Sequence, residues 1–286
     1  MTLMVVCGVL VVAGLAAVVA WGGLDIAGPP GDPGGHGPGE GTPSVGLTLR
    51  RLAWHLDIAV VSGLAAGLMA SGAGGRLAMR LLAVTAGEGA QGRITEAEEV
   101  VGRITTGGTI AFVIFGGLFA GVVTGPLLVA IRRWLPRGRW RGVAFGLLLL
   151  VVGATRVEPL RANNRDFDIV GPSWLALIVF SAVVLAHGMV NVAIASRVSR
   201  ALPLLSRRPA AVLAHLPLVL LLLPSPLVIG TLVVALAAVG LRSLPMSRVL
   251  ASPKVLRAGR VVLGLAAAVS LPGFLATFAD ISGRGP

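Results

Sequence analysis

Long uninterrupted apolar segments constrain this chain more than any other feature of its sequence. The segments lie at about 3–24, 52–75, 107–131, 174–195 and 261–278. An α-helix needs about 20 apolar residues to cross the hydrocarbon core of a bilayer. Every backbone amide in that core must be hydrogen-bonded within the protein, and a helix achieves this by itself. The segments therefore predict an all-α fold, a polytopic transmembrane helical bundle.

Two further segments bring the expected number of spans to about eight. A shorter apolar segment from 142 to 157 adds one span. The segment 210–241 is long for a single span, and Pro224 and Pro226 at its midpoint predict a break. We therefore expect two short helices there, joined as a hairpin around Ser225.

Three regions divide the chain. Residues 1–24 are signal-like but lack a positively charged start, so we expect a retained first transmembrane helix. Residues 25–49 are rich in glycine and proline, which predicts a flexible tether. Residues 50–286 then form a helical membrane domain with the seven remaining spans.

Basic residues predict the orientation in the membrane. If the N-terminus and the C-terminus are both extracytoplasmic, sixteen of the 24 basic residues flank the cytoplasmic ends of the spans. The positive-inside rule favours this arrangement. The loops 85–106 and 158–173 are then extracytoplasmic. Tryptophans also lie near the predicted span ends, as an interfacial aromatic belt requires: Trp21, Trp54, Trp134, Trp140 and Trp174.

Composition narrows the class of protein. Only 13% of the residues are charged, against about 25% in soluble domains. The net charge of +12 does not indicate a nucleic-acid partner, because no soluble domain is present to carry a basic face. The bias toward Arg, Ala, Gly and Pro is typical of GC-rich coding and favours a bacterial plasma membrane. Cys7 stands alone in the sequence, which excludes an internal disulfide and a cysteine-built metal site.

Small residues recur at every fourth position in two of the spans. They are Gly63, Gly67, Ser71 and Gly75 in the second span and Gly117, Gly121 and Gly125 in the third. Such stripes let helix backbones approach closely in lipid. We expect the two spans to pack as a tight pair. The alternative is that these residues line a path or permit sliding between states.

The segment VEPLRANNRDFDIVGPSW (157–174) is polar within an otherwise apolar chain. Together with arginines at the end of the second span it supplies a candidate outer polar patch: Arg76, Arg80, Glu158, Arg161, Asn164, Arg165, Asp166 and Asp168. Arginine matches oxyanions in two-point contact, so the patch could hold a phosphate or an anionic lipid head group. The alternative is that the acids of the loop pair with its own arginines. The alternating oxygen side chains lack the glycine and the glutamate of a Ca²⁺ loop, so no metal is expected.

The loop 85–106 contains a pattern typical of a helix start. Thr95 and Glu98 have the spacing of a capping box. Glu99 and Arg103 stand four residues apart, on the same face of a helix. We therefore expect a short surface helix in this loop.

One acidic residue is predicted at membrane depth. Asp57, with His55 nearby, forms a candidate relay for protons or cations, because intramembrane ionisable groups usually face a cavity or a partner. The alternative is that Asp57 pairs with Arg50 or Arg51.

Two histidines lie within other spans. His187 and His215 are expected to form hydrogen bonds between helices, with Asn191 one turn after His187. Two histidines at similar depth could also hold a haem, but the sequence gives little reason to expect a cofactor.

Known catalytic templates are missing from the sequence, which disfavours an enzyme. We find no serine-hydrolase elbow, no zinc-protease motif and no phosphate-binding loop. The favoured function is a carrier or channel for a small polar or ionic solute, with Asp57 and the outer arginines on its route. The alternative is a non-catalytic membrane subunit or scaffold that binds a membrane protein or a lipid head group through its outer loops. An intramembrane enzyme is the third hypothesis.

Overall fold

The structure is a computed structural model that describes residues 2–30, 44–96, 98–157, 159–222, 234, 236–237, 239–240 and 252–284. These residues form helices, turns and one isolated β-bridge. Five helices are long and apolar enough to cross a membrane: Thr2–Trp21, Val45–Thr85, Thr106–Ile131, Ser173–Ala201 and Pro253–Ser282. A sixth apolar helix, Trp140–Ala154, is shorter. The all-helical architecture is thereby confirmed for the described residues, whereas the number of eight spans is not.

The first two long helices begin earlier than the sequence suggests. Helix α1 covers Thr2–Trp21. The second long helix consists of α2 (Val45–Ala66), the π-helical segment η1 (Gly67–Gly72) and α3 (Ala73–Thr85) without interruption. It starts at Val45 because the Ser44 hydroxyl accepts a hydrogen bond from the Leu47 amide at 3.2 Å, which caps the helix.

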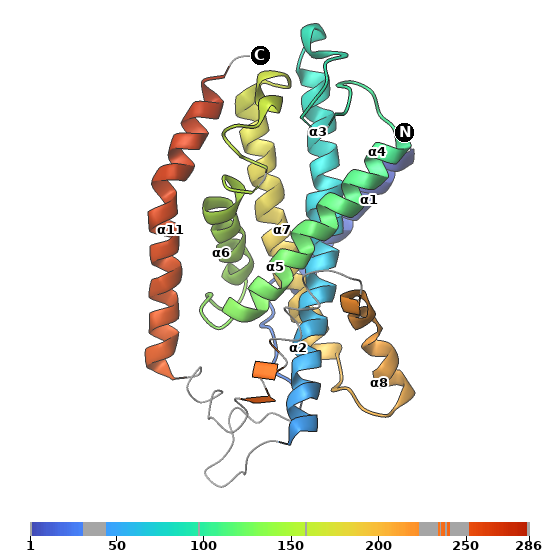
Figure 1. Cartoon of the computed structure of the whole chain (residues 1–286), viewed down its shortest axis with the longest axis vertical. Coiled ribbons are helices and arrows are strands. Elements are labelled where there is room, and N and C mark those ends of the chain that lie inside the picture. Colours follow the sequence, from blue (N-terminus) through green and yellow to red (C-terminus); the bar gives the residue numbers. More distant parts are fainter. Residues whose placement is uncertain are drawn as a thin grey trace.

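The next two helices also contain π-helical segments. The third long helix is α4 (Thr106–Ala111), η3 (Phe112–Gly116) and α5 (Gly117–Ile131), and it crosses obliquely in front of the second (Figure 1). The shorter helix is α6 (Trp140–Leu148) followed by η4 (Leu149–Ala154).

Two long helices complete the bundle. Helix α7 (Ser173–Ala201) packs against α1, α2 and α6, and α11 (Pro253–Ser282) lies at the edge beside η4 and α7. The remaining elements are short: η2 (Glu88–Ala90), η5 (Arg165–Asp168), α8 (Pro209–Ala214) and η6 (Leu216–Leu222). Most of the segment 210–241, including the expected turn at Pro224 and Pro226, lies outside the described residues.

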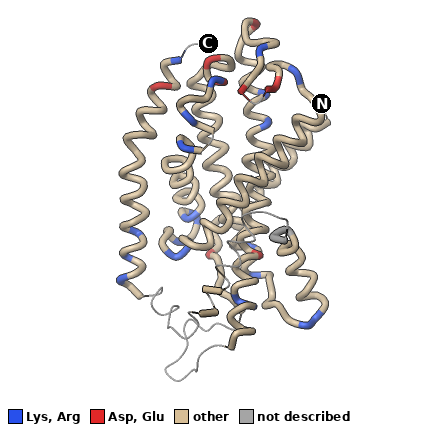
Figure 2. The backbone as a smooth tube through the Cα atoms, in the orientation of Figure 1, with Lys and Arg blue, Asp and Glu red and all other residues tan. Residues whose placement is uncertain are grey.

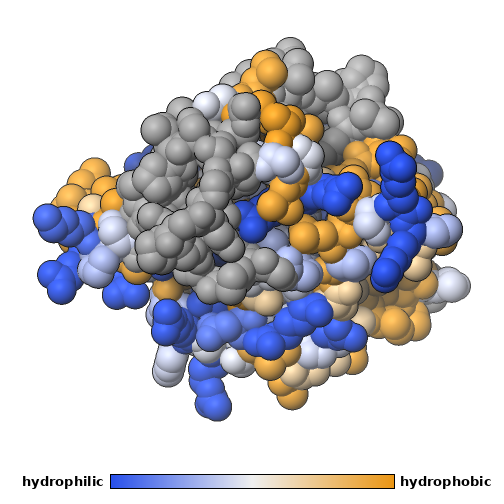
Figure 3. Space-filling model, turned by 90° about the horizontal axis from the view of Figure 1, so that it is seen from below, coloured by the Kyte–Doolittle hydropathy of each residue, from blue (hydrophilic) through white to orange (hydrophobic). Residues whose placement is uncertain are grey.

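Both described ends of the chain and the loops 86–105 and 155–172 lie at one end of the bundle, which we call the cap end (Figure 1). The turn after Ile131 and the last turn of α7 lie at the opposite end, which we call the basic end. Charged residues gather toward the two ends, and the middle of the bundle is mostly uncharged (Figure 2). Seen from the basic end, hydrophilic side chains lie among hydrophobic ones on the described part of this face (Figure 3). The two loops thus lie at the same end of the bundle, as the predicted topology requires. Which side of the membrane each end faces stays a prediction.

The chain that follows α1 is fixed to the basic end. Arg141 Nη1 lies 3.0 Å from Asp25 Oδ1, and the Ser196 hydroxyl donates to the Leu24 carbonyl at 2.9 Å. The Ala27 amide donates to the Ser199 hydroxyl at 2.9 Å. The start of the expected tether is therefore attached to the bundle, while residues 31–43 lie outside the described part of the chain.

Small residues bring α2, η1 and α5 into backbone contact. A Cβ atom on Gly63 would overlap the Gly121 carbonyl, and one on Gly67 would overlap the Gly117 carbonyl. A Cβ atom on Gly125 would overlap the Ala59 carbonyl. Close backbone approach of this kind replaces the hydrophobic driving force, which is absent between helices in lipid. This contact fixes the crossing of the second and third long helices.

Two local expectations are wrong. Trp54 is not part of an interfacial belt: it is fully buried, and its indole Nε1 donates to the Leu202 carbonyl at 3.0 Å. The expected surface helix at Thr95 is instead a tight turn, in which the Thr95 and Glu99 backbones are hydrogen-bonded at 2.9 Å. Glu98 has φ of 59°, a left-handed conformation that interrupts a right-handed helix. The Thr95 hydroxyl thus caps a turn rather than a helix, accepting from the Glu99 amide at 3.1 Å.

Candidate functional site

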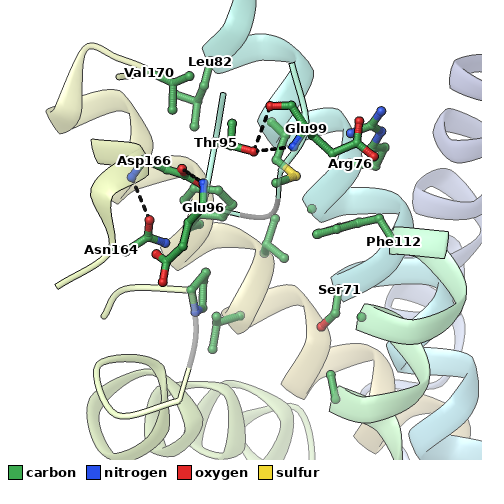
Figure 4. A pocket seen from close by; sticks show the side chains of 18 of the residues that line it. Ser71, Arg76, Leu82, Thr95, Glu96, Glu99, Phe112, Asn164, Asp166 and Val170 are labelled. Carbon is green, nitrogen blue, oxygen red and sulfur yellow. Dashed lines mark hydrogen bonds between the residues drawn. The ribbon is translucent and has the colours of Figure 1, made fainter. Parts of the chain in front are cut away.

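A cavity of about 700 Å³ lies under the cap end. Its walls come from η1 and α3, from η3 and α5, from η4, from α7 and from the two cap loops. Figure 4 shows Arg76 and Glu99 on one side of its mouth, Asn164 and Asp166 on the other, and Ser71 deeper. The cavity therefore runs from the charged cap toward the middle of the bundle.

All three π-helical segments that the structure describes contribute to this cavity. Ser71 comes from η1, Phe112 and Gly116 come from η3, and Leu149 and Gly153 come from η4. A π-helical segment inside an α-helix is rare and occurs often at functional sites, because the extra residue displaces side chains from their regular positions. Three of them around one cavity single out this part of the molecule.

Among the described residues, the mouth of the cavity carries more positive than negative side chains. Four arginines line it, together with three acidic residues: Arg76, Arg80, Arg103, Arg161, Glu96, Glu99 and Asp166. The side chains of two of these arginines are hydrogen-bonded to neighbouring segments. Arg76 Nε donates to the Thr109 hydroxyl at 3.1 Å, and Arg80 Nη1 lies 3.5 Å from the Gly102 carbonyl. Their guanidinium groups are thereby held at the entrance.

The two cap loops are joined across the mouth. Arg161 Nη2 lies 2.7 Å from Glu96 Oε1, and the Glu96 amide donates to Asp166 Oδ1 at 2.7 Å. The Asn164 side chain accepts from the Asp166 amide at 2.8 Å. Arg161 and Glu96 thus form an ion pair between the two loops. Glu158, which one hypothesis pairs with an arginine of its own loop, lies outside the described residues.

These contacts change the acidity of two cap residues in opposite directions. The hydrogen bond from Arg161 lowers the pKa of Glu96, so this carboxylate is ionised at neutral pH. Burial raises the pKa of Asp166, although the Glu96 amide partly offsets the effect. The mouth thus combines a fixed ion pair with a carboxyl group that gains a proton more readily than usual.

Apolar side chains form the walls below the mouth. Phe112, Phe119, Val123, Leu149 and Val183 all line the cavity. Phe119 is 63% exposed and Val123 is 53% exposed, so this wall is shared with the outer surface of the bundle. If the bundle sits in a bilayer, lipid lies next to this wall.

A buried polar cluster closes the inner end of the cavity. His187 Nδ1 lies 2.8 Å from the Ser71 hydroxyl, and His187 Nε2 lies 2.7 Å from the Thr124 hydroxyl. Asn191 Nδ2 donates to the same Thr124 oxygen at 3.2 Å. Ser71, Thr124 and His187 line the cavity, and Asn191 is fully buried behind them. We call these four residues the polar floor.

Several residues of the predicted outer patch lie away from the cavity. Asp168 is 3.8 Å from Arg284 Nη1 and does not line it. Arg165 borders a separate recess with Ile94 and Asn163. Glu158 lies outside the described residues. The structure therefore brings together Arg76, Arg80, Arg161, Asn164 and Asp166 from that prediction.

The two residues of the candidate relay are also remote from the cavity. Asp57 lies fourteen positions before Ser71, about 20 Å along the helix. It is fully buried and hydrogen-bonds to His215, so its partner is a histidine and not Arg50 or Arg51. His55 accepts from Arg132 Nη2 at 2.9 Å, and its Nδ1 lies 2.7 Å from the Arg51 carbonyl. Asp57 and His55 thus have separate partners.

Sequence reasoning did not find the polar floor as a group. Ser71 was assigned to helix packing because it continues a four-residue repeat, and His187 and Asn191 were assigned to interhelical hydrogen bonding. Thr124 was not singled out. The available signal is that all four are polar residues inside apolar spans, although their pairing depends on the tertiary structure.

Comparison of the chain with models of protein families, with curated proteins and with solved structures found no match.

Proposed function

We propose that this protein binds an amphipathic molecule with an acidic head group in the cavity under its cap. The head group would sit among Arg76, Arg80 and Arg161, and the apolar part would lie along Phe119 and Val123. The observation that carries this proposal is the continuity of one cavity from an arginine-bearing mouth to apolar walls. The volume of about 700 Å³ is within the range of about 300–1,000 Å³ typical of small-molecule sites.

The apolar walls favour an amphipathic ligand over the small polar or ionic solute expected from the sequence. A small ion in this cavity would lose hydration without gaining partners beside Phe112, Phe119 or Val123. An anionic lipid would place its charge at the guanidinium groups and its hydrocarbon part at these walls. A binding role of this kind agrees with a carrier for lipids and with a scaffold that holds a lipid head group. The location in a bacterial plasma membrane stays a prediction from composition.

The test fills the cavity with a bulky side chain, introduced at a position where an added Cβ atom meets no neighbour. Gly153 lines the cavity, and a Cβ atom there has no neighbour within 4 Å, so Gly153→Phe would place a ring in the cavity. Gly264 on α11 also has no neighbour within 4 Å and is exposed on the outer face. Gly264→Phe is therefore the matched control.

The measurement is binding of phosphatidylglycerol and phosphatidylcholine to the full chain in mild detergent, read by native mass spectrometry. We expect the wild type and Gly264→Phe to retain phosphatidylglycerol in preference to phosphatidylcholine, and Gly153→Phe to lose that preference. Equal retention of both lipids by the wild type, or unchanged selectivity in Gly153→Phe, would refute the proposal.

A further inference from the structure

We propose that Ser71 is a nucleophile activated by His187, and that it attacks an ester bond of the amphipathic molecule bound in the cavity. The substrate in this inference is the amphipathic molecule of the proposed function. The inference adds an acyl-transfer reaction, for which the sequence contains none of the known catalytic motifs. Its basis is the geometry of the polar floor, where a cavity-lining hydroxyl is hydrogen-bonded to a buried imidazole.

The hydrogen bonds of Thr124 guide the assignment of the His187 proton. The Thr124 hydroxyl lies 2.8 Å from the Ala120 carbonyl, and we assign its single proton to that carbonyl, so that its oxygen accepts from its other neighbours. We therefore assign the proton of His187 to Nε2, which donates to Thr124 at 2.7 Å. His187 Nδ1 then carries a lone pair and accepts from the Ser71 hydroxyl at 2.8 Å.

This arrangement has the three parts of an activated nucleophile. Ser71 supplies the hydroxyl, His187 supplies the base within hydrogen-bond distance, and Thr124 orients the base. Asn191 fixes Thr124 in turn, at 3.2 Å. His187 is only 2% exposed and Asn191 is fully buried, so the base is held by the protein rather than by solvent.

The position of Ser71 suits an ester close to a head group. Ser71 lies on η1 and precedes Arg76 by five residues, about 7.5 Å along the helix axis. If the acidic group of a ligand is bound at Arg76, the bonds that lie a few atoms further along the ligand are next to Ser71, deeper in the cavity. Glycerolipids carry acyl esters at this place in the molecule, and their chains would continue along the apolar wall.

The reaction balances with water as the second reactant. Ser71 Oγ forms a bond to the ester carbonyl carbon while its proton passes to His187 Nδ1. The tetrahedral species then breaks the carbon–oxygen bond of the alcohol, which leaves with the proton from His187. Water entering at the charged mouth next attacks the acyl carbon and gives a proton to His187. The bond between the acyl carbon and Ser71 Oγ then breaks, the proton returns from His187 to Ser71 Oγ, and the fatty acid is released.

The test is labelling of the full chain in detergent by a fluorophosphonate with a long alkyl chain, which reacts with activated serines. We expect the wild type to be labelled at Ser71, as located by peptide mass spectrometry, and Ser71→Ala to be unlabelled. His187→Gln should slow labelling about 100-fold or more, because a positioned base contributes about 10²- to 10⁴-fold. Ser62→Ala, on the same helix but fully buried and not lining the cavity, is the control.

The outcomes separate this inference from the proposed function. Labelling at the wild-type rate in His187→Gln, or no labelling of Ser71 in a wild type that retains phosphatidylglycerol, would overturn the nucleophile and leave the binding function standing. If the wild type neither retains phosphatidylglycerol nor is labelled at Ser71, the proposed function and the proposed nucleophile are both refuted. Thermal unfolding and gel filtration of each variant show whether it is folded, and Ser71→Thr gives a second variant that keeps a hydroxyl at this position.

Discussion

The backbones of Gly63 and Gly121 are in direct contact, because a Cβ atom on either glycine would overlap the carbonyl oxygen of the other. This contact joins the second long helix to the third at the centre of their crossing. It also sets the position of Ser71 and Thr124, which lie on these two helices and both contact His187. The small-residue stripe therefore positions one side of the polar floor.

Adding a methyl group at the crossing should destabilise the bundle. We expect Gly121→Ala to lower the free energy of unfolding by about 1–3 kcal/mol, because the backbones must separate to admit the new carbon. The measurement is reversible unfolding in mixed micelles. Gly8→Ala on α1, where a Cβ has no neighbour within 4 Å, is the control and should leave stability unchanged or slightly raised. Equal stability of Gly121→Ala and the wild type would contradict the contact.

The buried pair of Asp57 and His215 should be needed for folding. Both side chains are almost fully buried, and Asp57 Oδ1 and His215 Nε2 have no hydrogen-bond partner among the described residues. Asp57→Leu would leave a buried imidazole without its partner, at a cost of about 3–5 kcal/mol. The double variant Asp57→Leu/His215→Leu should recover much of this loss, as measured in a double-mutant cycle. If Asp57→Leu is as stable as the wild type, the pair does not contribute to folding, and a relay role for Asp57 becomes the better interpretation.

The ion pair between Arg161 and Glu96 should make the order of the cap dependent on pH. The pKa of Glu96 is below its ordinary value of 4.5 in the folded protein, so its contribution is fully present above pH 4.5. The contribution is lost as the pH falls through the folded pKa, because the carboxylate is then protonated.

Hydrogen exchange of the loop 86–105 measures this effect. We expect faster exchange in Glu96→Gln than in the wild type at neutral pH, and a shrinking difference on acidification below 4.5. Glu88→Gln, at an exposed glutamate in the same loop, should exchange as the wild type does at every pH. A difference for Glu96→Gln that does not change with pH would mean that the pair is not responsible.

The arginines at the mouth should determine which head groups bind. Arg76→Gln should weaken the retention of phosphatidylglycerol roughly tenfold, because a charge-assisted hydrogen bond contributes about 1.5–3 kcal/mol. Retention of phosphatidylcholine should change little. Arg257→Gln, at an exposed arginine in the first turns of α11, is the control. Equal weakening of both lipids would indicate a general loss of structure rather than recognition of charge.

The pairing of polar side chains could not be predicted from the sequence. Ser71 and His187 are separated by 116 positions, and Thr124 and His187 by 63. Their meeting depends on the rotation of each helix about its axis and on the oblique crossing of α5. The same dependence explains why the alternative to a relay role for Asp57 named an arginine partner close in sequence, whereas its partner His215 is 158 positions away.

The sequence by itself determined that the described part of the chain is helical and approximately where its long helices lie. The reason is local: an apolar segment in lipid must satisfy its own backbone hydrogen bonds, and a helix does so without distant partners. Only the tertiary structure decided what the polar residues within those helices contact, because helix packing brings together Arg76 and Thr109, Arg161 and Glu96, and Ser71 and His187. The cavity between them exists only when all of its walls are assembled.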